Sequence, residues 1–419
     1  MSAPPNLRFN ILALGADFGL FLVGMSFASS STILPAFAVY LGAPNVAIGA
    51  IPAVMTLGWF LPSLFAAGHT ESLARKLPFV LRWTAWERVP FLALALIAFF
   101  VADRAPAVAL ALLLVMLALA TGVGGVLMPA WMDIVGRAIP VTLRGRFFAA
   151  TSLAASAAGL AGSFLTAHIL ATVPAPASYG VCFLCSAACM GLSYVALVLV
   201  REPGGAVPAE RVGMRAHLGR MPALLRGDRN LTWFLAARSL GLVGAMAMGF
   251  YTVYALRVWS PPAAEIGAFT ALLLAGQMAG TVTFGWLADR AGHRLVLITG
   301  IAATLGANVT ALLAPSLSAY GIVFVLAGVQ QAALTVSGLN MLLEFAPVPR
   351  EQPTYVGLGT TSMAPVALGA PLLAGLLADA RGFTAVFVIA AAAGVAALGL
   401  LVTRVRDPRH LRALSMAEP

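Results

Sequence analysis

Hydrophobic residues along the chain gather in twelve long runs, separated by short charged or Pro/Gly-rich breaks. A bilayer core of about 30 Å takes about 20 helical residues, and backbone polar groups inside it must be paired within the spanning element. The runs lack the period-2 alternation of strands, so they predict helices. We expect membrane spans near 11–39, 47–68, 79–101, 107–135, 147–173, 179–200, 231–256, 265–287, 295–314, 318–345, 355–379 and 383–403.

Composition supports this interpretation. The chain is 61% hydrophobic and only 10% charged, with a mean hydropathy of +0.95, whereas soluble domains are roughly 45–50% apolar and 25% charged. The first run follows Arg8 and is longer than the apolar region of a usual signal peptide. We therefore interpret it as a retained first helix.

Basic residues predict the orientation. If both termini are cytoplasmic, nineteen of the 25 Lys and Arg residues fall in cytoplasmic segments, and the outer loops hold only Arg104, Arg257 and Arg381. This is the bias that sets membrane topology. It predicts a multi-pass protein of the cytoplasmic (inner) membrane with both termini in the cytoplasm. It also explains the net charge of +10 without nucleic acid, because basic loops suit the anionic inner leaflet.

One long polar stretch, Arg201 to Asn230, divides the chain. The predicted organisation is an all-α integral membrane protein with two six-helix bundles and polar connecting segments. We assign 1–200 to the N-terminal bundle, 201–230 to a cytoplasmic central loop, 231–404 to the C-terminal bundle and 405–419 to a cytoplasmic tail.

Two stretches match each other, "GWLADRAGHRLVLI" from Gly285 and "GLLADARGFTAVFV" from Gly375. They lie three spans apart, so the predicted topology puts them on opposite membrane faces. That arrangement indicates an inverted three-plus-three repeat, which is typical of secondary transporters with substrate sites near the midplane.

The loop between the eighth and ninth predicted spans resembles the G-x-L-A-D-R-x-G-R-R motif of the major facilitator superfamily. The residues that carry this resemblance are Gly285, Asp289, Arg290, Gly292 and Arg294. The matching loop of the first half, "AAGHTESLARKLP", departs from the pattern. The resemblance, which covers the whole chain in topology, implies a transporter whose halves rock around a central cavity.

Acidic residues near the ends of the fourth and tenth predicted spans suggest partners for these loops. We predict two cytoplasmic latches, formed by Glu71, Arg75 and Asp133 in the first half and by Asp289, Arg290 and Glu344 in the second. As the resemblance implies, they would hold the outward-open state. The alternative is that these charges are solvated and set only the topology.

Four charges lie deep in predicted spans. At about 1.5 Å per residue, Asp17, Glu87, Arg88 and Arg238 sit roughly 10–14 Å inside, where an ionised side chain costs at least ~2.5–3.5 kcal/mol. Our hypothesis is that Asp17 and Arg238 form a cavity pair, with Asp17 the protonatable coupling residue. A static stabilising pair is the alternative. Glu87 and Arg88 are about 100° apart on their helix, so we expect each to pair with another helix, either structurally or, for Glu87, in a proton path.

Uncharged polar residues within the spans supply a possible substrate lining, although each is also compatible with helix packing. They are Ser30, Thr32, Gln277, Gln330 and Gln331. The sequence has no G-x-x-x-x-G-K-[ST] motif for ATP, no H-E-x-x-H or similar metal cluster and no spaced Ser/His/Asp set. We therefore expect no cofactor, no metal and no enzymatic activity.

The combined interpretation is a secondary active transporter of a small organic solute, coupled to protons and favouring export. We expect a monomer whose partners are the solute, the proton and the lipid bilayer. Sodium coupling and uniport stay open, as do the substrate and the oligomeric state. A non-transporting assembly factor or sensor with the same fold is the alternative that the degenerate first loop favours.

Overall fold

The structure is a computed structural model that describes residues 6–71, 73–203, 226–346 and 352–408. Every regular element in these ranges is a helix, and twelve helical segments are long and apolar enough to cross a membrane. The predicted all-α fold with twelve spans is therefore confirmed. The chain divides into two compact units, Met1–Arg211 with Ser260–Ala271 and Val212–Trp259 with Leu272–Pro419.

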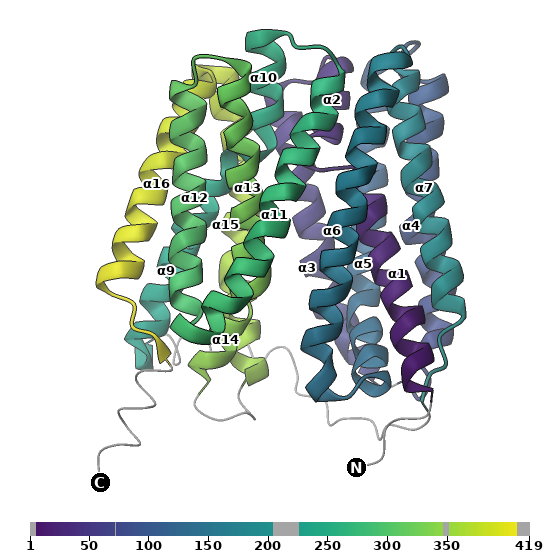
Figure 1. Cartoon of the computed structure of the whole chain (residues 1–419), viewed down its shortest axis with the longest axis vertical. Coiled ribbons are helices and arrows are strands. Elements are labelled where there is room, and N and C mark those ends of the chain that lie inside the picture. Colours follow the sequence, from purple (N-terminus) through teal and green to yellow (C-terminus); the bar gives the residue numbers. More distant parts are fainter. Residues whose placement is uncertain (1–5, 72, 204–225, 347–351, 409–419) are drawn as a thin grey trace. The chain divides into compact units, whose positions relative to one another are not determined.

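Helices of the first unit run side by side in Figure 1. Helix α3 packs along α5, α1 along α6 and α7, and α4 along α5 and α7. The described helices are α1 (Leu7–Phe27), α2 (Ile33–Tyr40), α3 (Asn45–Glu71), α4 (Leu77–Phe100), α5 (Pro106–Ala138), α6 (Val141–Thr172) and α7 (Ala177–Val198).

Close contact between α3 and α5 depends on glycine. A Cβ atom added at Gly58 would overlap the Thr121 side chain and lie 2.9 Å from the backbone nitrogen of Gly122. Gly125 in turn faces the carbonyl oxygen of Gly58. Small residues let membrane helices approach this closely, and packing replaces the missing hydrophobic drive between them.

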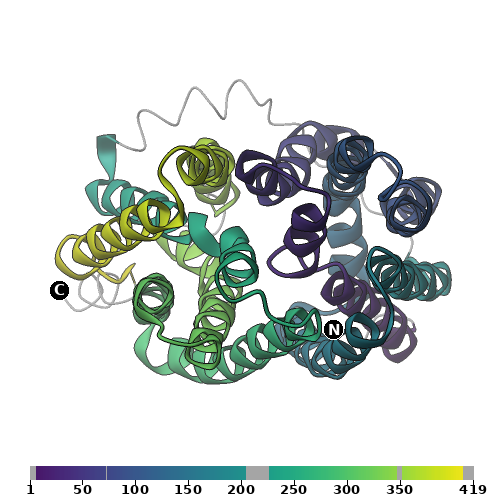
Figure 2. The ribbon, with the colours of Figure 1, turned by 90° about the horizontal axis from the view of Figure 1, so that it is seen from above.

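The second unit is also built of helices that pack closely against one another. Figure 2 looks along its helices, where the yellow α16 lies against the teal α9. Its elements are α9 (Arg229–Gly244), the 3-10 helix η1 (Ala245–Phe250), α10 (Tyr251–Trp259), α11 (Ala264–Ala291, which begins in the first unit), α12 (His293–Leu313), α13 (Leu317–Ser337), α14 (Asn340–Phe345), α15 (Gln352–Arg381) and α16 (Phe383–Thr403).

The first predicted span, 11–39, is not one helix but two. Helix α1 ends at Phe27 and α2 begins at Ile33. Between them the Ser29 hydroxyl accepts from the amide of Ser31, and the Ser29 carbonyl accepts from the amides of Thr32 and Leu34. Local bonds from serine and threonine compete with helical ones, which the apolar length of the run does not reveal. The seventh span is likewise interrupted, by η1.

Candidate functional site

The deepest polar feature of the first unit surrounds Asp17. The Arg88 Nη2 donates to Asp17 Oδ1 at 2.9 Å, and the Ser193 hydroxyl donates to the same oxygen at 2.7 Å. The Trp131 indole donates to Oδ2 at 2.9 Å. Asp17 is 2% exposed and Arg88 8%. Helices α1, α4, α5 and α7 thus each contribute one side chain to this arrangement, in which three donors satisfy a single buried carboxylate.

Glu87 joins the same arginine. Its Oε2 lies 3.0 Å from Arg88 Nη1 and accepts from the Thr84 hydroxyl at 2.9 Å. We expected each of these neighbours on α4 to pair with another helix, which holds for Arg88 with Asp17 of α1 but not for Glu87, whose ion pair is with Arg88 itself. Helical side chains lean toward the N-terminus, so both reach the turn of Thr84, where the arginine also contacts the threonine hydroxyl.

Asp17, Arg88 and Glu87 therefore form one cluster, in which two carboxylates share one guanidinium. With both acids ionised, its formal charge is −1, and one added proton makes it neutral. Isolated charges are costly in a membrane interior. The arrangement can therefore hold one proton beside a permanent ion pair.

The predicted partners Asp17 and Arg238 belong to different units, and each has partners within its own unit. Sequence reasoning missed Arg88 as the partner of Asp17, although the similar depth of the two residues in their helices could have indicated the pair. Asp17 is the eleventh residue of α1 and Arg88 the twelfth of α4. Both residues thus lie near the middle of a helix of similar length, at a similar depth in the bundle.

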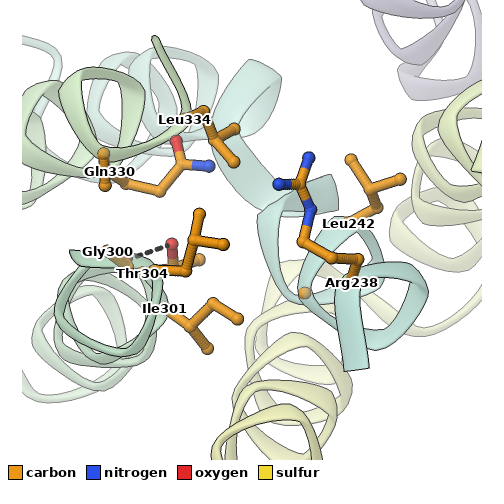
Figure 3. A pocket seen from close by; sticks show the side chains of 10 residues that line it. Arg238, Leu242, Gly300, Ile301, Thr304, Gln330 and Leu334 are labelled. Carbon is orange, nitrogen blue, oxygen red and sulfur yellow. Dashed lines mark hydrogen bonds between the residues drawn. The ribbon is translucent and has the colours of Figure 1, made fainter. Parts of the chain in front are cut away.

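Arg238 lies in a small pocket of the second unit, shown in Figure 3. Its Nη1 lies 3.4 Å from the Gly338 carbonyl oxygen, a long hydrogen bond. Gln330 of α13 and Thr304 of α12 face the same space, which has an empty volume of about 360 Å³ including its open mouth. Within the described residues of this unit, no carboxylate forms an ion pair with Arg238.

Asp133 of the proposed first latch is paired inside the first unit. It contacts Lys76 Nζ at 2.7 Å and Arg137 Nη2 at 2.6 Å. Glu202 accepts from the backbone amide of Lys76 at 2.8 Å, at the start of α4. Arg75 is exposed, and the side chain of Glu71 lies outside the described part of the structure. The charged group beside Asp133 is thus built from Lys76 and Arg137, which we had not considered.

Two residues of the loop motif in the second half of the chain, Gly292 and Arg294, lie at the junction between α11 and α12. Gly292 adopts a φ of 84°, the left-handed region that favours glycine. Arg294 donates to the carbonyl oxygens of Leu401 and Val402 at the end of α16, at 2.9–3.1 Å.

The acids and the remaining motif residues have other positions. Asp289 and Arg290 are exposed, and the Arg290 guanidinium lies 4.3 Å from the centre of the Trp286 ring. Glu344 approaches His293 Nε2 at 3.7 Å, rather than Arg290. A Cβ at Gly285 would meet no atom of the described chain within 4 Å, so close packing does not require glycine there.

The proposed lining residues lie at separate places. Ser30 borders an opening beside α3 and α5, and the Thr32 hydroxyl shares a 2.7 Å hydrogen bond with that of Thr270 in the same unit. Gln331 donates to the sulfur of Met248 at 3.4 Å. Gln277 is half-buried on α11. Of the five, Gln330 is the one that lines the Arg238 pocket.

Comparison with known proteins relates part of the chain to a family. The Major Facilitator Superfamily family model matches residues 240–418. Solute carrier family 22 member 6 of Mus musculus is 32% identical over 105 residues, which are 25% of this chain and 18% of that protein. The Rattus norvegicus protein of the same name is 31% identical over the same shares. The chain thus matches only about a fifth of the length of these curated relatives.

Solved structures resemble the chain over nearly its full length. A point mutant of the nucleoside transporter NupG aligns with a TM-score of 0.71 at 11% identity, covering 94% of this chain and 98% of that one. A bacterial homologue of the iron transporter ferroportin gives 0.69 at 17% identity, with the same coverage. A POT family transporter in complex with 5-aminolevulinic acid gives 0.70 at 12%, covering 95% of each.

At such identities the structural likeness shows the fold, while the family match rests on the second half of the chain. The second half of the chain therefore matches the Major Facilitator Superfamily model, and the whole chain is a multi-pass membrane protein with the fold of these solved transporters.

Proposed function

We propose that the chain is a proton-coupled secondary transporter that moves a small organic solute across the cytoplasmic membrane by alternating access. The observation that carries this proposal is the buried cluster of Asp17, Arg88 and Glu87. Fold alone does not specify activity, so the argument rests on what these three side chains can do.

Two acids around one arginine make a natural proton site. When Arg88 contacts Asp17, the carboxylate is compensated and hydrogen-bonded. If a change of conformation separates α1 from α4, Asp17 becomes an uncompensated buried charge unless it takes up a proton. Glu87 remains on the same helix as Arg88 and can retain the ion pair. Proton binding and helix movement are therefore energetically linked.

The remaining parts of the proposal follow the expectations from sequence. We propose cytoplasmic termini, because the basic loops would then lie inside, and export as the direction of transport. A small organic solute is in keeping with solved relatives described as transporters of nucleosides and organic anions, which share the fold only.

The test is transport by the purified protein in liposomes. A mixture of small organic solutes is offered with and without an imposed pH gradient, and the moved compounds are identified by mass spectrometry. We expect gradient-dependent movement of at least one solute by the wild type. Asp17→Asn should lose the response to the gradient, whereas Asp103→Asn, at an exposed acid bonded to Tyr40, should keep it.

Each other result has a definite meaning. Wild-type response to the gradient in Asp17→Asn would refute coupling through this residue. Failure of the wild type to move any solute, together with intact folding, would refute transport. That outcome would favour the assembly factor or sensor, which the departure of the first-half loop from the family motif supports.

A further inference from the structure

The Arg238 pocket offers positive charge without a counter-ion among the described residues of its unit. We propose that this pocket binds the acidic group of a small organic acid that also carries a hydroxyl or amino group, and that this acid is the transported solute. The last clause rests on the proposed function, but the binding site does not.

Arg238 has unused capacity to bind an anion. A guanidinium has five N–H donors in a planar fork that suits a carboxylate, and the described contacts of Arg238 are the long bond to Gly338 and the Phe234 ring at 6.0 Å. Figure 3 shows the guanidinium turned into the space bordered by Gln330 and Leu334. A half-buried cation in this setting is stabilised by any anion that enters.

Gln330 supplies the second, independent observation. The residue is 6% exposed, yet its Oε1 has no hydrogen-bond partner among the described residues. In Figure 3 its amide faces the same space as the arginine. A buried acceptor left unpaired is unfavourable, and a ligand hydroxyl or amino group that donates to it removes that cost. The amide nitrogen is free to donate to the anion.

The first unit satisfies its buried charges differently. Arg88 is the twelfth residue of α4, and Thr304 is the twelfth residue of α12. In the first unit this position holds Arg88, which neutralises the buried Asp17. In the second unit it holds Thr304, a neutral hydroxyl that lines the Arg238 pocket. That hydroxyl donates to the Gly300 carbonyl at 3.1 Å and can still accept. We infer that the missing negative charge comes with the ligand.

Shape and lining limit the size of the ligand. The empty volume of about 360 Å³ includes solvent at the open mouth, so the enclosed part holds little more than the acidic group itself. Apolar walls come from Leu242, Leu297, Ile301 and Leu334. The pocket therefore suits a short, branched aliphatic acid better than a large conjugate.

Binding is tested by calorimetry on the full chain in detergent, with a panel of matched acids and amides. One set is 2-hydroxy-4-methylpentanoate, 4-methylpentanoate, which lacks the hydroxyl, and 2-hydroxy-4-methylpentanamide, which lacks the charge. We expect the hydroxy acid to bind about ten-fold or more tightly than either, because each analogue loses one polar interaction.

Variants assign the preferences to side chains. Arg238→Gln should abolish the preference for acid over amide, and Gln330→Leu the preference for the hydroxyl. Arg238→Lys keeps the charge and should retain a weaker preference for the acid, which covers the case in which Arg238→Gln fails to fold. Arg257→Gln is the control, because Arg257 lies 5.3 Å from the Phe383 ring and outside the pocket. It should bind like the wild type.

The experiments distinguish failure of the proposed binding site from failure of the proposed transport activity. If no acid of the panel binds the wild type better than its amide, or if the preference survives in Arg238→Gln, the assignment of the pocket is wrong. Acid binding without flux in liposomes would uphold the pocket and refute transport. Proton-driven flux of a neutral solute, unchanged in Arg238→Gln, would uphold the proposed function and overturn the substrate class.

Discussion

Removal of Arg88 should be the most damaging single change in the first unit. Arg88→Met preserves much of the side-chain volume but leaves Asp17 and Glu87 without their shared cation. All three residues are at most 8% exposed. Breaking a buried pair by removing one partner typically costs about 3–5 kcal/mol, since an uncompensated buried charge remains. We expect a loss of that size in the free energy of unfolding.

The measurement is reversible unfolding of the purified protein in mixed micelles at neutral pH, followed by tryptophan fluorescence. Asp17→Asn and the double variant Asp17→Asn/Arg88→Met complete a double-mutant cycle. The asparagine is neutral and should relieve part of the penalty, so the double variant should be more stable than the sum of the single changes predicts.

Arg82→Met is the control on the same helix, because Arg82 is exposed and a surface substitution usually changes stability by less than about 0.5 kcal/mol. A loss below about 1 kcal/mol in Arg88→Met, or a coupling energy of zero between positions 17 and 88, would refute the cluster. The proton argument would then lose its structural basis.

Three further results are expected. Gly58→Leu should destabilise the first unit by about 1–3 kcal/mol or more, measured by the same unfolding assay, because its side chain overlaps α5. Asp133→Asn should cost less than about 1 kcal/mol, and less still at high salt, because the Asp133 side chain is 37% exposed at its contact with Lys76; a cost independent of salt would contradict this. Hydrogen bonding to Asp103 raises the pKa of Tyr40 to about 12, so the stabilisation it adds is complete below about pH 10 and is lost as the pH rises toward 12. Ultraviolet titration against Tyr40→Phe should show this ionisation, and Asp103→Asn should move it back toward pH 10.

The lengths of the apolar runs predicted the twelve membrane spans, because whether a segment can cross the bilayer depends on that segment alone. A helix of about 20 residues satisfies its own backbone in hydrocarbon, wherever its neighbours lie. The same reasoning located the central polar stretch. It did not predict the break at Ser29, because a run of four polar residues, 29–32, lies inside an otherwise apolar stretch and its local hydrogen bonds replace helical ones.

Sequence also marked the residues of the candidate sites. Depth in an apolar helix singled out Asp17, Glu87, Arg88 and Arg238, because a charge placed there needs a partner, water or a proton. Their number and depth along the chain are readable from sequence, since each residue adds a fixed rise to its helix.

Partner choice was decided by tertiary structure. Whether Asp17 meets Arg88 or another base depends on how α1, α4, α5 and α7 are rotated about their axes and on the rotamers of long side chains. Close approach at glycines constrains those rotations, as at Gly24 of α1 against α7 and Gly124 of α5 beside Glu87 of α4. The unpaired Oε1 of Gln330 beside Arg238 can likewise be recognised only in the packed structure. Whether a buried acceptor has a hydrogen-bond partner depends on the side chains that three different helices bring around it.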